Sequence, residues 1–320
     1  MSKKRSDVKR KKQESQRLLF IGICAVVFIL VVAFFAYAWF VTLPQKNAKL
    51  WTIDATTGKL SFTDNGDTTA YVNSTVSTAN YTLQTIVYQS FGDNVYADLM
   101  IPNNVTRPPV VIVLPAVTIN RTANRPTAEA LCAMGYATLT LDERGNFGQT
   151  PGPLMNDFDT GYRTFATGGD PVQFKQIYDV LKGYDYLKTR SDVDGNDVSL
   201  LGESIGGMWS VIAGGVQPQF KGVIAVSSSD FGFAPTTGQN ASRFLKASTP
   251  STYVSSLPPR KLVMIHFDND SIIPIADGKA LYDKASEPKA WYQYNGSTHG
   301  LWDPVFAGDV HKELQGMLGR

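Results

Sequence analysis

Apolar runs and amphipathic segments alternate along most of the chain after residue 80. Residues 81–90 and 95–102 flank the turn Phe91-Gly92-Asp93-Asn94, which predicts two antiparallel strands joined as a hairpin. Later runs predict further strands, and several are apolar throughout, as strands buried on both faces of a parallel sheet are. These runs cover residues 109–115, 136–142, 197–203, 221–228, 261–267 and 290–296.

Segments with a helical spacing of apolar residues separate these strands. The clearest has Asp170 as a good N-cap and Pro171 at its first helical position. Strands that alternate with helices after an antiparallel start predict an α/β fold, with a mostly parallel sheet of about eight strands and helices on both faces. The apolar face of the clearest helix comprises Phe174, Ile177, Tyr178, Leu181 and Leu187.

The first 43 residues follow a different pattern. Residues 18–43 contain no charged side chain, and at about 1.5 Å per residue this run is long enough to cross a hydrocarbon core of roughly 30 Å. Eight lysines and arginines precede it, although the net charge of the whole chain is only +2. Because basic residues stay on the cytoplasmic side, we expect a single-pass membrane protein with residues 1–17 inside and the rest outside. Ala36-Tyr37-Ala38 has the form of a cleavage site, so a signal peptide is the alternative.

The remaining boundaries follow from composition. The polar segment 44–80 predicts a stalk or N-terminal extension ahead of a catalytic domain at 81–320, with a small lid around residues 230–259. Cys24 falls in the apolar span and Cys132 in a predicted helix, so we expect no disulfide between them. Membrane topology accounts for the basic tail, so no nucleic-acid partner is expected.

The stretch VSLLGESIGG, Val198–Gly207, carries the first candidate for chemistry. A predicted strand leads into Gly-Glu-Ser-Ile-Gly and a predicted helix follows, which is the context of the sharp turn that presents a serine nucleophile. Gly202 and Gly206 fit such a turn, because strand and helix approach too closely there for side chains. Ser204 is therefore the candidate nucleophile, and the alternative is a structural serine in an ordinary strand-to-helix turn.

A serine hydroxyl needs a base to take its proton, and the chain has three histidines. His266 lies within an apolar strand, which indicates a core or strand-end residue. His311 lies among charged residues of a C-terminal helix, which indicates exposure. His299 lies in a glycine-flanked loop just after the last predicted strand, and it is the candidate base.

A carboxylate should orient the imidazole, and the segment HFDNDSIIP supplies Asp268 and Asp270. This segment resembles the motif His-Gly-x-x-Asp-x-x-Val-Pro of the α/β-hydrolase superfamily, with Phe267 in place of the glycine. The resemblance places Asp270 in the catalytic position and leaves Asp268 as a turn cap. The resulting chain order of Ser204, Asp270 and His299 is that of the superfamily.

The resemblance covers roughly residues 81–320 and implies an α/β-hydrolase fold of the esterase, dienelactone-hydrolase-like or prolyl-oligopeptidase-like kind. It extends to the loop LDERGNFGQT, residues 141–150, which is similar to the Asp-x-Arg-Gly-x-Gly loop after the fourth strand of that superfamily, with one extra residue before Gly148. In such enzymes the aspartate and arginine of this loop support the site structurally. Asp142 and Arg144 are therefore assigned no chemistry.

An oxyanion hole requires two backbone N–H groups aimed at the developing negative charge. One is expected from Ile205, which follows the nucleophile and begins its helix, where the helix dipole favours an anion. In the superfamily the second donor follows a His-Gly pair after the third strand. This chain has Pro115-Ala116 there, so Val117 is the candidate by position.

These residues predict a membrane-anchored serine hydrolase that works outside the cell, cleaving small-molecule carboxylic esters through an acyl-enzyme on Ser204. A serine peptidase of the prolyl-oligopeptidase-like type is the nearest alternative, and a non-catalytic binding module with a hydrolase fold is another. The sequence has no Walker-type Gly-Lys-Ser/Thr motif and no cluster of His and Cys ligands, so neither a cofactor nor a metal is expected. It does not indicate an oligomeric state.

Overall fold

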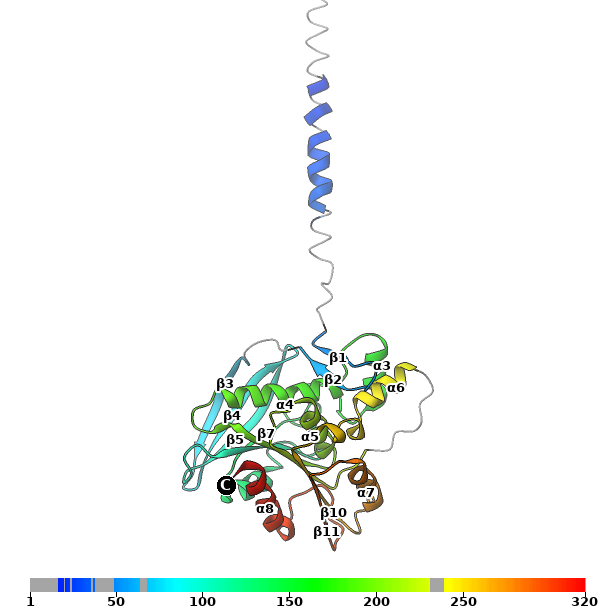
Figure 1. Cartoon of the computed structure of the whole chain (residues 1–320). Coiled ribbons are helices and arrows are strands. Elements are labelled where there is room, and N and C mark those ends of the chain that lie inside the picture. The colour runs from blue at the N-terminus through cyan, green and yellow to red at the C-terminus, as the bar shows by residue number, and fades with distance from the viewer. Residues whose placement is uncertain are drawn as a thin grey trace, which may run out of the picture. The chain divides into compact units, whose positions relative to one another are not determined.

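The computed structural model describes residues 17–19, 21–23, 25–35, 37, 49–63, 68–230 and 239–319, and it separates residues 1–48 from a second compact unit, residues 49–320. In the first unit, Arg17–Phe35 is a helix of 19 residues that is long and apolar enough to cross a membrane (Figure 1). A signal sequence near the N-terminus has the same properties. The predicted roles of Cys24 and of Ala36 and Ala38 fall outside the described residues.

A nine-stranded sheet forms the centre of the second unit, in the order β11-β10-β9-β8-β6-β7-β5-β4-β3. Neighbours from β11 to β7 are parallel, whereas β7, β5, β4 and β3 pair antiparallel at the other end. The strands are β3 (Ala70–Ser77), β4 (Tyr81–Ser90), β5 (Asp93–Pro102), β6 (Pro109–Leu114), β7 (Ala137–Leu141), β8 (Asp194–Glu203), β9 (Gly222–Val226), β10 (Lys261–Phe267) and β11 (Lys289–Tyr294).

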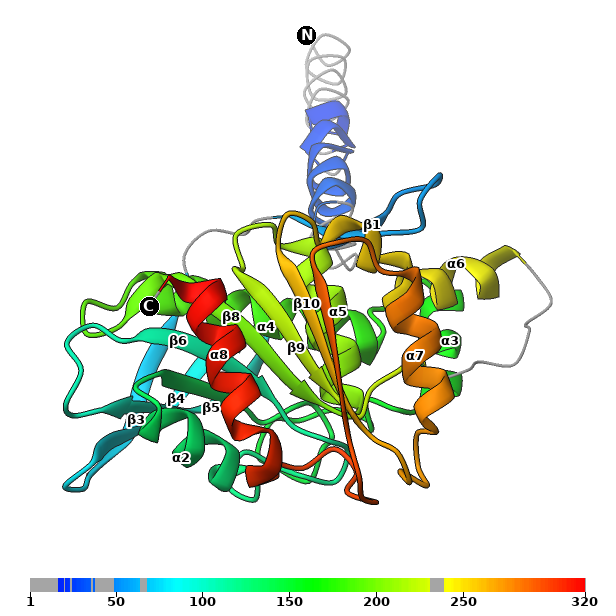
Figure 2. The same ribbon diagram turned by 60° about the horizontal axis from the view of Figure 1, so that its bottom comes forward.

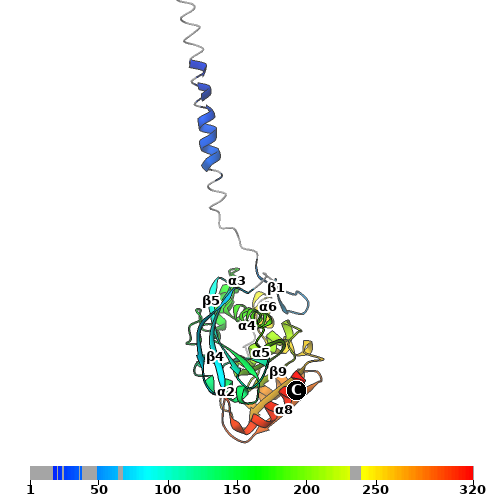
Figure 3. The same ribbon diagram turned by 90° about the vertical axis from the view of Figure 1, so that its left-hand side faces the viewer.

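Helices cover both faces of this sheet, as Figures 2 and 3 show. Successive residues of β8 enter opposite layers of the core. Leu200 packs in the layer of α4 (Val172–Lys188) and α5 (Ile205–Val216), and Leu201 in the layer of α2 (Arg125–Ala133) and α8 (Ala307–Leu318). The predicted α/β fold with helices on both faces is therefore confirmed. The helices are α2 (Arg125–Ala133), α3 (Phe158–Ala166), α4 (Val172–Lys188), α5 (Ile205–Val216), α6 (Gln239–Ala247), α7 (Ile275–Lys284) and α8 (Ala307–Leu318), with 3₁₀ turns η1 (Pro250–Thr252), η2 (Val254–Ser256) and η3 (Pro304–Phe306).

The compact unit begins earlier than the predicted boundary at residue 81. The segment predicted as a stalk contains β3, which pairs with β4, and a hairpin of β1 (Trp51–Ile53) and β2 (Leu60–Phe62). Trp51 and Leu60 are buried beside Phe174 and Phe244. The sheet therefore has nine strands where about eight were predicted. The extra strand β3 is exposed at almost every position, so it lacks the alternation that marks a half-buried strand.

Helix α4 begins one residue later than predicted. Pro171 has an extended backbone (φ −57°, ψ 142°) and is itself the N-cap, so the prediction that Asp170 caps this helix is wrong. The Asp170 carboxylate instead accepts a hydrogen bond of 2.8 Å from the indole N–H of Trp51. This bond satisfies the polar atom of a buried indole, which an apolar core alone cannot do.

The predicted lid lies only partly within the described residues. Residues 231–238 are outside them, and the rest of 230–259 forms α6, η1 and η2. Tyr253, between the two 3₁₀ turns, accepts a hydrogen bond from the Leu60 N–H at 2.9 Å and donates one to the Ala247 carbonyl at 2.8 Å. These described parts therefore pack against the β1–β2 hairpin.

Candidate active site

Ser204 occupies a strained turn between β8 and α5. Its backbone has φ +55° and ψ −118°, a conformation that costs free energy for any residue with a Cβ atom. The Ser204 N–H donates to the Val226 carbonyl at 2.8 Å, which ties the turn to the end of β9. Strain at a serine between a strand and a helix is the feature that the Gly-x-Ser-x-Gly pattern predicts.

Gly206 is required by the close approach of α5 to the end of β6. A Cβ atom there would lie 2.0 Å from the backbone oxygen of Leu114 and 2.6 Å from that of Pro115, and both are fixed main-chain atoms. We therefore expect Gly206→Ala to lower the free energy of unfolding by about 3 kcal/mol or more, measured by denaturant titration. Gly316→Ala, on α8, is the control, because its new Cβ meets nothing within 4 Å. This substitution should raise the free energy of unfolding by about 0.5–1 kcal/mol. Equal effects at the two sites would contradict this account of the turn.

The structure brings together the three side chains that the sequence singled out. The Nε2 atom of His299 lies 2.9 Å from the Ser204 hydroxyl oxygen. Its Nδ1 atom lies 2.8 Å and 3.0 Å from the two carboxylate oxygens of Asp270. One continuous chain of hydrogen bonds thus runs from a buried carboxylate, through an imidazole, to a serine hydroxyl, which is the arrangement that activates a serine.

Asp270 and Asp268 have separate environments. Burial raises the pKa of Asp270, but hydrogen bonds from His299 and from the N–H groups of Ile273 and Ile272 outweigh it and hold that pKa below its usual value. Asp270 is thereby held as the carboxylate. Asp268 accepts the Gly296 N–H at 2.9 Å and so joins the loop after β10 to the loop after β11.

His266 is a buried histidine near this site, as its place in an apolar strand predicts. Its ring is fully buried and stacks on Trp291, with centroids 5.5 Å apart. Neither ring nitrogen has a hydrogen-bond partner among the described residues. Burial lowers the pKa of His266 to about 4; Asp270 opposes this fall, His299 assists it, and the Ile273 backbone and Asp277 oppose it to a smaller extent. His266 is therefore neutral in the folded protein at neutral pH.

A neutral buried histidine makes stability fall on acidification. Between about pH 6.5 and pH 4 the unfolded chain binds a proton at this residue that the folded chain does not, so the free energy of unfolding decreases as pH falls. From pH 7 to pH 5 we expect His266 to account for about 2 kcal/mol of that decrease. Denaturant titrations at both pH values should show a smaller decrease in His266→Leu than in the wild type. An equal decrease in the two proteins would show that other groups cause it.

The backbone N–H groups of Ile205 and Val117 are the predicted oxyanion donors. Among the described residues, neither the Ile205 nor the Val117 backbone N–H has a hydrogen-bond partner. The loop after β6 that contains Val117 lies against the site: a Cβ placed on Gly300 would be 2.7 Å from the Ser204 Cβ and 3.5 Å from the Ala116 Cβ. Two unpaired donors on segments that adjoin the serine are what an oxyanion hole needs.

A family model decides the relationship of this chain to known proteins. Residues 68–234, just over half of the 320 residues, match the model of the acetyl xylan esterases (AXE1). The chain belongs to this family. The acetyl xylan esterase family consists of serine esterases of the α/β-hydrolase superfamily, so the superfamily predicted from the sequence motifs is confirmed.

This member of the acetyl xylan esterase family is similar to a curated protein of Escherichia coli. The uncharacterized protein YfhR of Escherichia coli K12 is 31% identical over 166 residues, which are 50% of this chain and 58% of YfhR. The chain thus matches little more than half the length of that curated relative.

Solved structures show the same fold. An acetyl xylan esterase from Paenibacillus sp. R4 (19% identity, TM-score 0.67) aligns over 79% of this chain and 90% of its own. Acetyl xylan esterase 1 from Thermoanaerobacterium sp. JW/SL YS485 (15%, TM-score 0.64) aligns over 79% and 89%. A glucuronoyl esterase from Solibacter usitatus (15%, TM-score 0.57) aligns over 80% and 88%.

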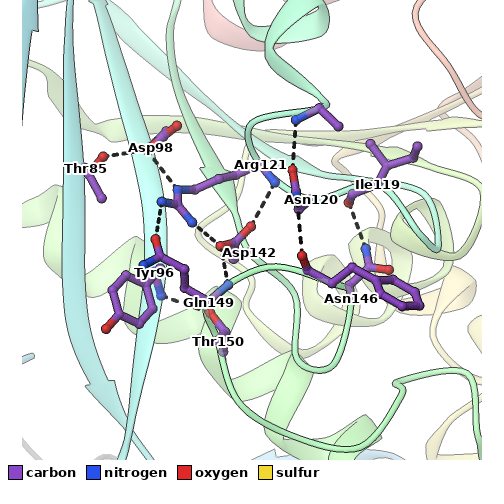
Figure 4. A network of polar contacts seen from close by, with 12 residues as sticks. Thr85, Tyr96, Asp98, Ile119, Asn120, Arg121, Asp142, Asn146, Gln149 and Thr150 are labelled. Atoms are coloured by element: carbon purple, nitrogen blue, oxygen red, sulfur yellow. Dashed lines mark hydrogen bonds and ion pairs between the residues drawn. The ribbon is translucent and has the colours of Figure 1, made fainter.

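The aspartate and arginine predicted to support the site of this esterase-family chain both lie in buried networks. Asp142 accepts the Arg121 N–H and the Gln149 N–H, each at 2.9 Å, and pairs with the Arg121 guanidinium, which also contacts Asp98 (Figure 4). Arg144 is fully buried and bonds both carboxylate oxygens of Asp179, at 2.6 and 3.0 Å. These contacts fix the loop after β7 to β5 and to α4.

Two buried polar residues beside the site escaped the sequence analysis. Glu203 directly precedes Ser204 and accepts hydrogen bonds from Asn124 and from Thr127, at the start of α2. Burial raises the pKa of Glu203 to about 7, although these two bonds oppose the rise. Asn146 is fully buried against the loop of Val117.

The third histidine, His311, lies on α8, where its ring contacts the Tyr136 hydroxyl at 3.4 Å.

Proposed function

We propose that this protein is a serine esterase that cleaves carboxylic esters through an acyl-enzyme on Ser204. The observation that carries the proposal is the hydrogen-bond chain from Asp270 through His299 to Ser204, on a turn whose serine is held at positive φ. Membership of the acetyl xylan esterase family supports the same chemistry. The hydrogen-bond chain concerns the site itself, whereas the family match covers residues 68–234 and so includes Ser204 but neither Asp270 nor His299.

The reaction follows from these contacts in two halves. The Ser204 oxygen attacks the ester carbonyl carbon while His299 Nε2 takes the hydroxyl proton, and the N–H groups of Ile205 and Val117 bind the resulting oxyanion. The bond from carbon to the alcohol oxygen then breaks, and His299 gives that oxygen its proton. Water attacks the acyl-enzyme with His299 again as base, which releases the carboxylic acid and returns the proton to Ser204. Asp270 holds the imidazole and stabilises its charged form.

The acyl group is proposed to be small, with acetyl esters as the best substrates. The family model and two of the solved structures are named for acetyl xylan esterases, which supports acetylated carbohydrate as the substrate class. The test uses the full chain in detergent with p-nitrophenyl esters of graded acyl length, acetylated xylo-oligosaccharides and aminoacyl amides, and Ser204→Ala as the matched control. Ester turnover that falls with acyl length and is absent from Ser204→Ala is expected. Turnover of the amides alone would favour the peptidase, and no turnover with a folded domain would favour the binding module.

Anchoring in a membrane, with the catalytic unit outside the cytoplasm, is part of the same proposal. An uncharged span at residues 18–43 behind eight basic residues supports it, as does the apolar helix Arg17–Phe35. Protease added to intact cells should degrade the catalytic unit and spare a tag fused to the N-terminus. A mature chain free in the medium that begins at Trp39 would identify residues 1–38 as a cleaved signal peptide instead.

A further inference from the structure

We propose that Asn146 is a positioning residue that sets the direction of the Val117 N–H toward the oxyanion, an inference that rests on the proposed esterase function. Asn146 is fully buried in the loop after β7. Its Oδ1 accepts the Thr118 N–H at 2.6 Å, and its Nδ2 donates to the carbonyls of Ala116 at 2.9 Å and Ile119 at 2.8 Å. One side chain thus binds three backbone groups that surround Val117, and Figure 4 shows the bond to Ile119.

The four residues Ala116 to Ile119 form a turn that needs such a partner. The Ile119 N–H donates to the Ala116 carbonyl at 3.1 Å, which closes the turn. Thr118, its third residue, has φ +71°, where type II turns place glycine or asparagine. A β-branched side chain is strained in that conformation. The bond from the Thr118 N–H to Asn146 favours this orientation of the central peptide over the alternative in which the same N–H points elsewhere.

The direction of the Val117 N–H follows from peptide geometry. The Ala116 carbonyl and the Val117 N–H belong to one planar trans peptide, so they point in opposite directions. Asn146 Nδ2 and the Ile119 N–H hold the Ala116 carbonyl on one side of the turn. The Val117 N–H must therefore point away from Asn146, and it has no hydrogen-bond partner among the described residues.

Asn120 provides a matched control from the same pair of loops. Its Nδ2 donates to the Phe147 carbonyl at 3.2 Å and its Oδ1 accepts the Ala123 N–H at 2.9 Å. Like Asn146 it joins the loop after β6 to the loop after β7, as Figure 4 shows, but it contacts none of the backbone groups on either side of Val117. A general weakening of these loops should therefore affect variants of both asparagines alike.

The experiment compares Asn146→Asp and Asn146→Ala with Asn120→Asp and Asn120→Ala in the full chain, using p-nitrophenyl acetate. An ionised aspartate side chain in place of Asn146 has no donor for the two carbonyls, and alanine has no polar group at all. Both Asn146 variants should lose on the order of 10²-fold in kcat, the effect of losing one oxyanion donor, with KM changed less than about threefold. A boronic acid that mimics the tetrahedral intermediate should bind the Asn146 variants more weakly than the wild type, and the loss of affinity should follow the loss in kcat. Both Asn120 variants should stay within about threefold of the wild type in kcat.

A second variant separates positioning from general structural support. Glycine at position 118 adopts the positive φ of the turn without strain, so the turn no longer needs the hydrogen bond to Asn146. The kcat of Thr118→Gly/Asn146→Ala should therefore be at least about tenfold higher than that of Asn146→Ala. Val117→Pro removes the N–H itself at a turn position where proline fits, and it should match the loss of Asn146→Asp. Val117→Pro with undiminished kcat would overturn the proposal. So would Asn146 variants that resemble the Asn120 variants, or Asn146 variants that fail to fold even with Thr118→Gly.

These outcomes are distinct from failure of the esterase proposal. A wild-type chain that neither hydrolyses esters nor binds the boronic acid would refute the proposed function itself. A wild-type chain that does both, with kcat indifferent to Asn146, would refute only the role of Asn146.

Discussion

His299→Ala should lower kcat for ester hydrolysis by about 10⁶-fold, because removal of the base leaves the Ser204 hydroxyl without an acceptor for its proton. In the described structure the imidazole is the side chain that contacts this hydroxyl, at 2.9 Å. Initial rates with p-nitrophenyl acetate at saturating substrate measure the effect. The thermal midpoint should change little, because the His299 side chain is partly exposed in a loop.

His311→Ala is the control for this substitution. His311 contacts Tyr136 from α8, and its removal should leave kcat within about threefold of the wild type. If His299→Ala retained more than about one per cent of the wild-type kcat, another group would be the base, and the hydrogen-bond chain to Asp270 would have no catalytic meaning.

Asp270→Asn should lower kcat by about 10⁴-fold with the fold intact. Neutralising a triad aspartate has an effect of this size because the amide no longer holds the imidazole in the correct tautomer or stabilises its charged form. The two short contacts from the Asp270 carboxylate to His299 Nδ1 are the geometry on which this expectation depends. Steady-state kinetics, with circular dichroism to verify folding, measure the result.

Asp268→Asn is the control for the assignment of Asp270 as the carboxylate that holds His299. The Asp268 oxygen that accepts the Gly296 N–H has an equivalent in the asparagine amide, so the loop contact persists and kcat should stay within about threefold. A large loss in Asp268→Asn together with a small loss in Asp270→Asn would mean that the motif is misaligned by two residues.

Much of the fold was predictable because the parallel strands are buried on both faces. Strand β10 spans the same residues, 261–267, that its apolar run predicts. The β4–β5 hairpin is also present, but its turn is Phe91-Gly92 alone, because Asp93 and Asn94 of the predicted turn already pair with β4. Strand β3 was not predictable in this way, because its side chains face solvent and its place in the sheet depends on pairing with β4. The cap assigned to Asp170 was wrong: Pro171 is the N-cap, and the Asp170 carboxylate instead binds the indole N–H of Trp51, which is distant in the sequence.

The candidate site also contains residues that the sequence predicted and a residue that it did not. Ser204, Asp270 and His299 stand in local motifs, and the structure places them in one hydrogen-bond chain; their catalytic roles stay predictions until they are tested. Asn146 stands in the quoted loop LDERGNFGQT, but it acts on backbone groups 27 to 30 residues earlier in the chain. A sequence pattern does not indicate which distant main-chain atoms a side chain contacts, so the contacts of Asn146 could be identified only in the three-dimensional structure.

The central claim is that Ser204 is a nucleophile activated by His299, and a covalent probe tests it most directly. A fluorophosphonate reacts with an activated serine and leaves other hydroxyls unmodified. Intact-protein mass spectrometry should show one adduct per folded chain, and peptide mapping should place it on Ser204. The adduct should be absent from Ser204→Ala and strongly reduced in His299→Ala. A folded wild-type chain that gains no adduct, or gains it at a different residue, would contradict the account.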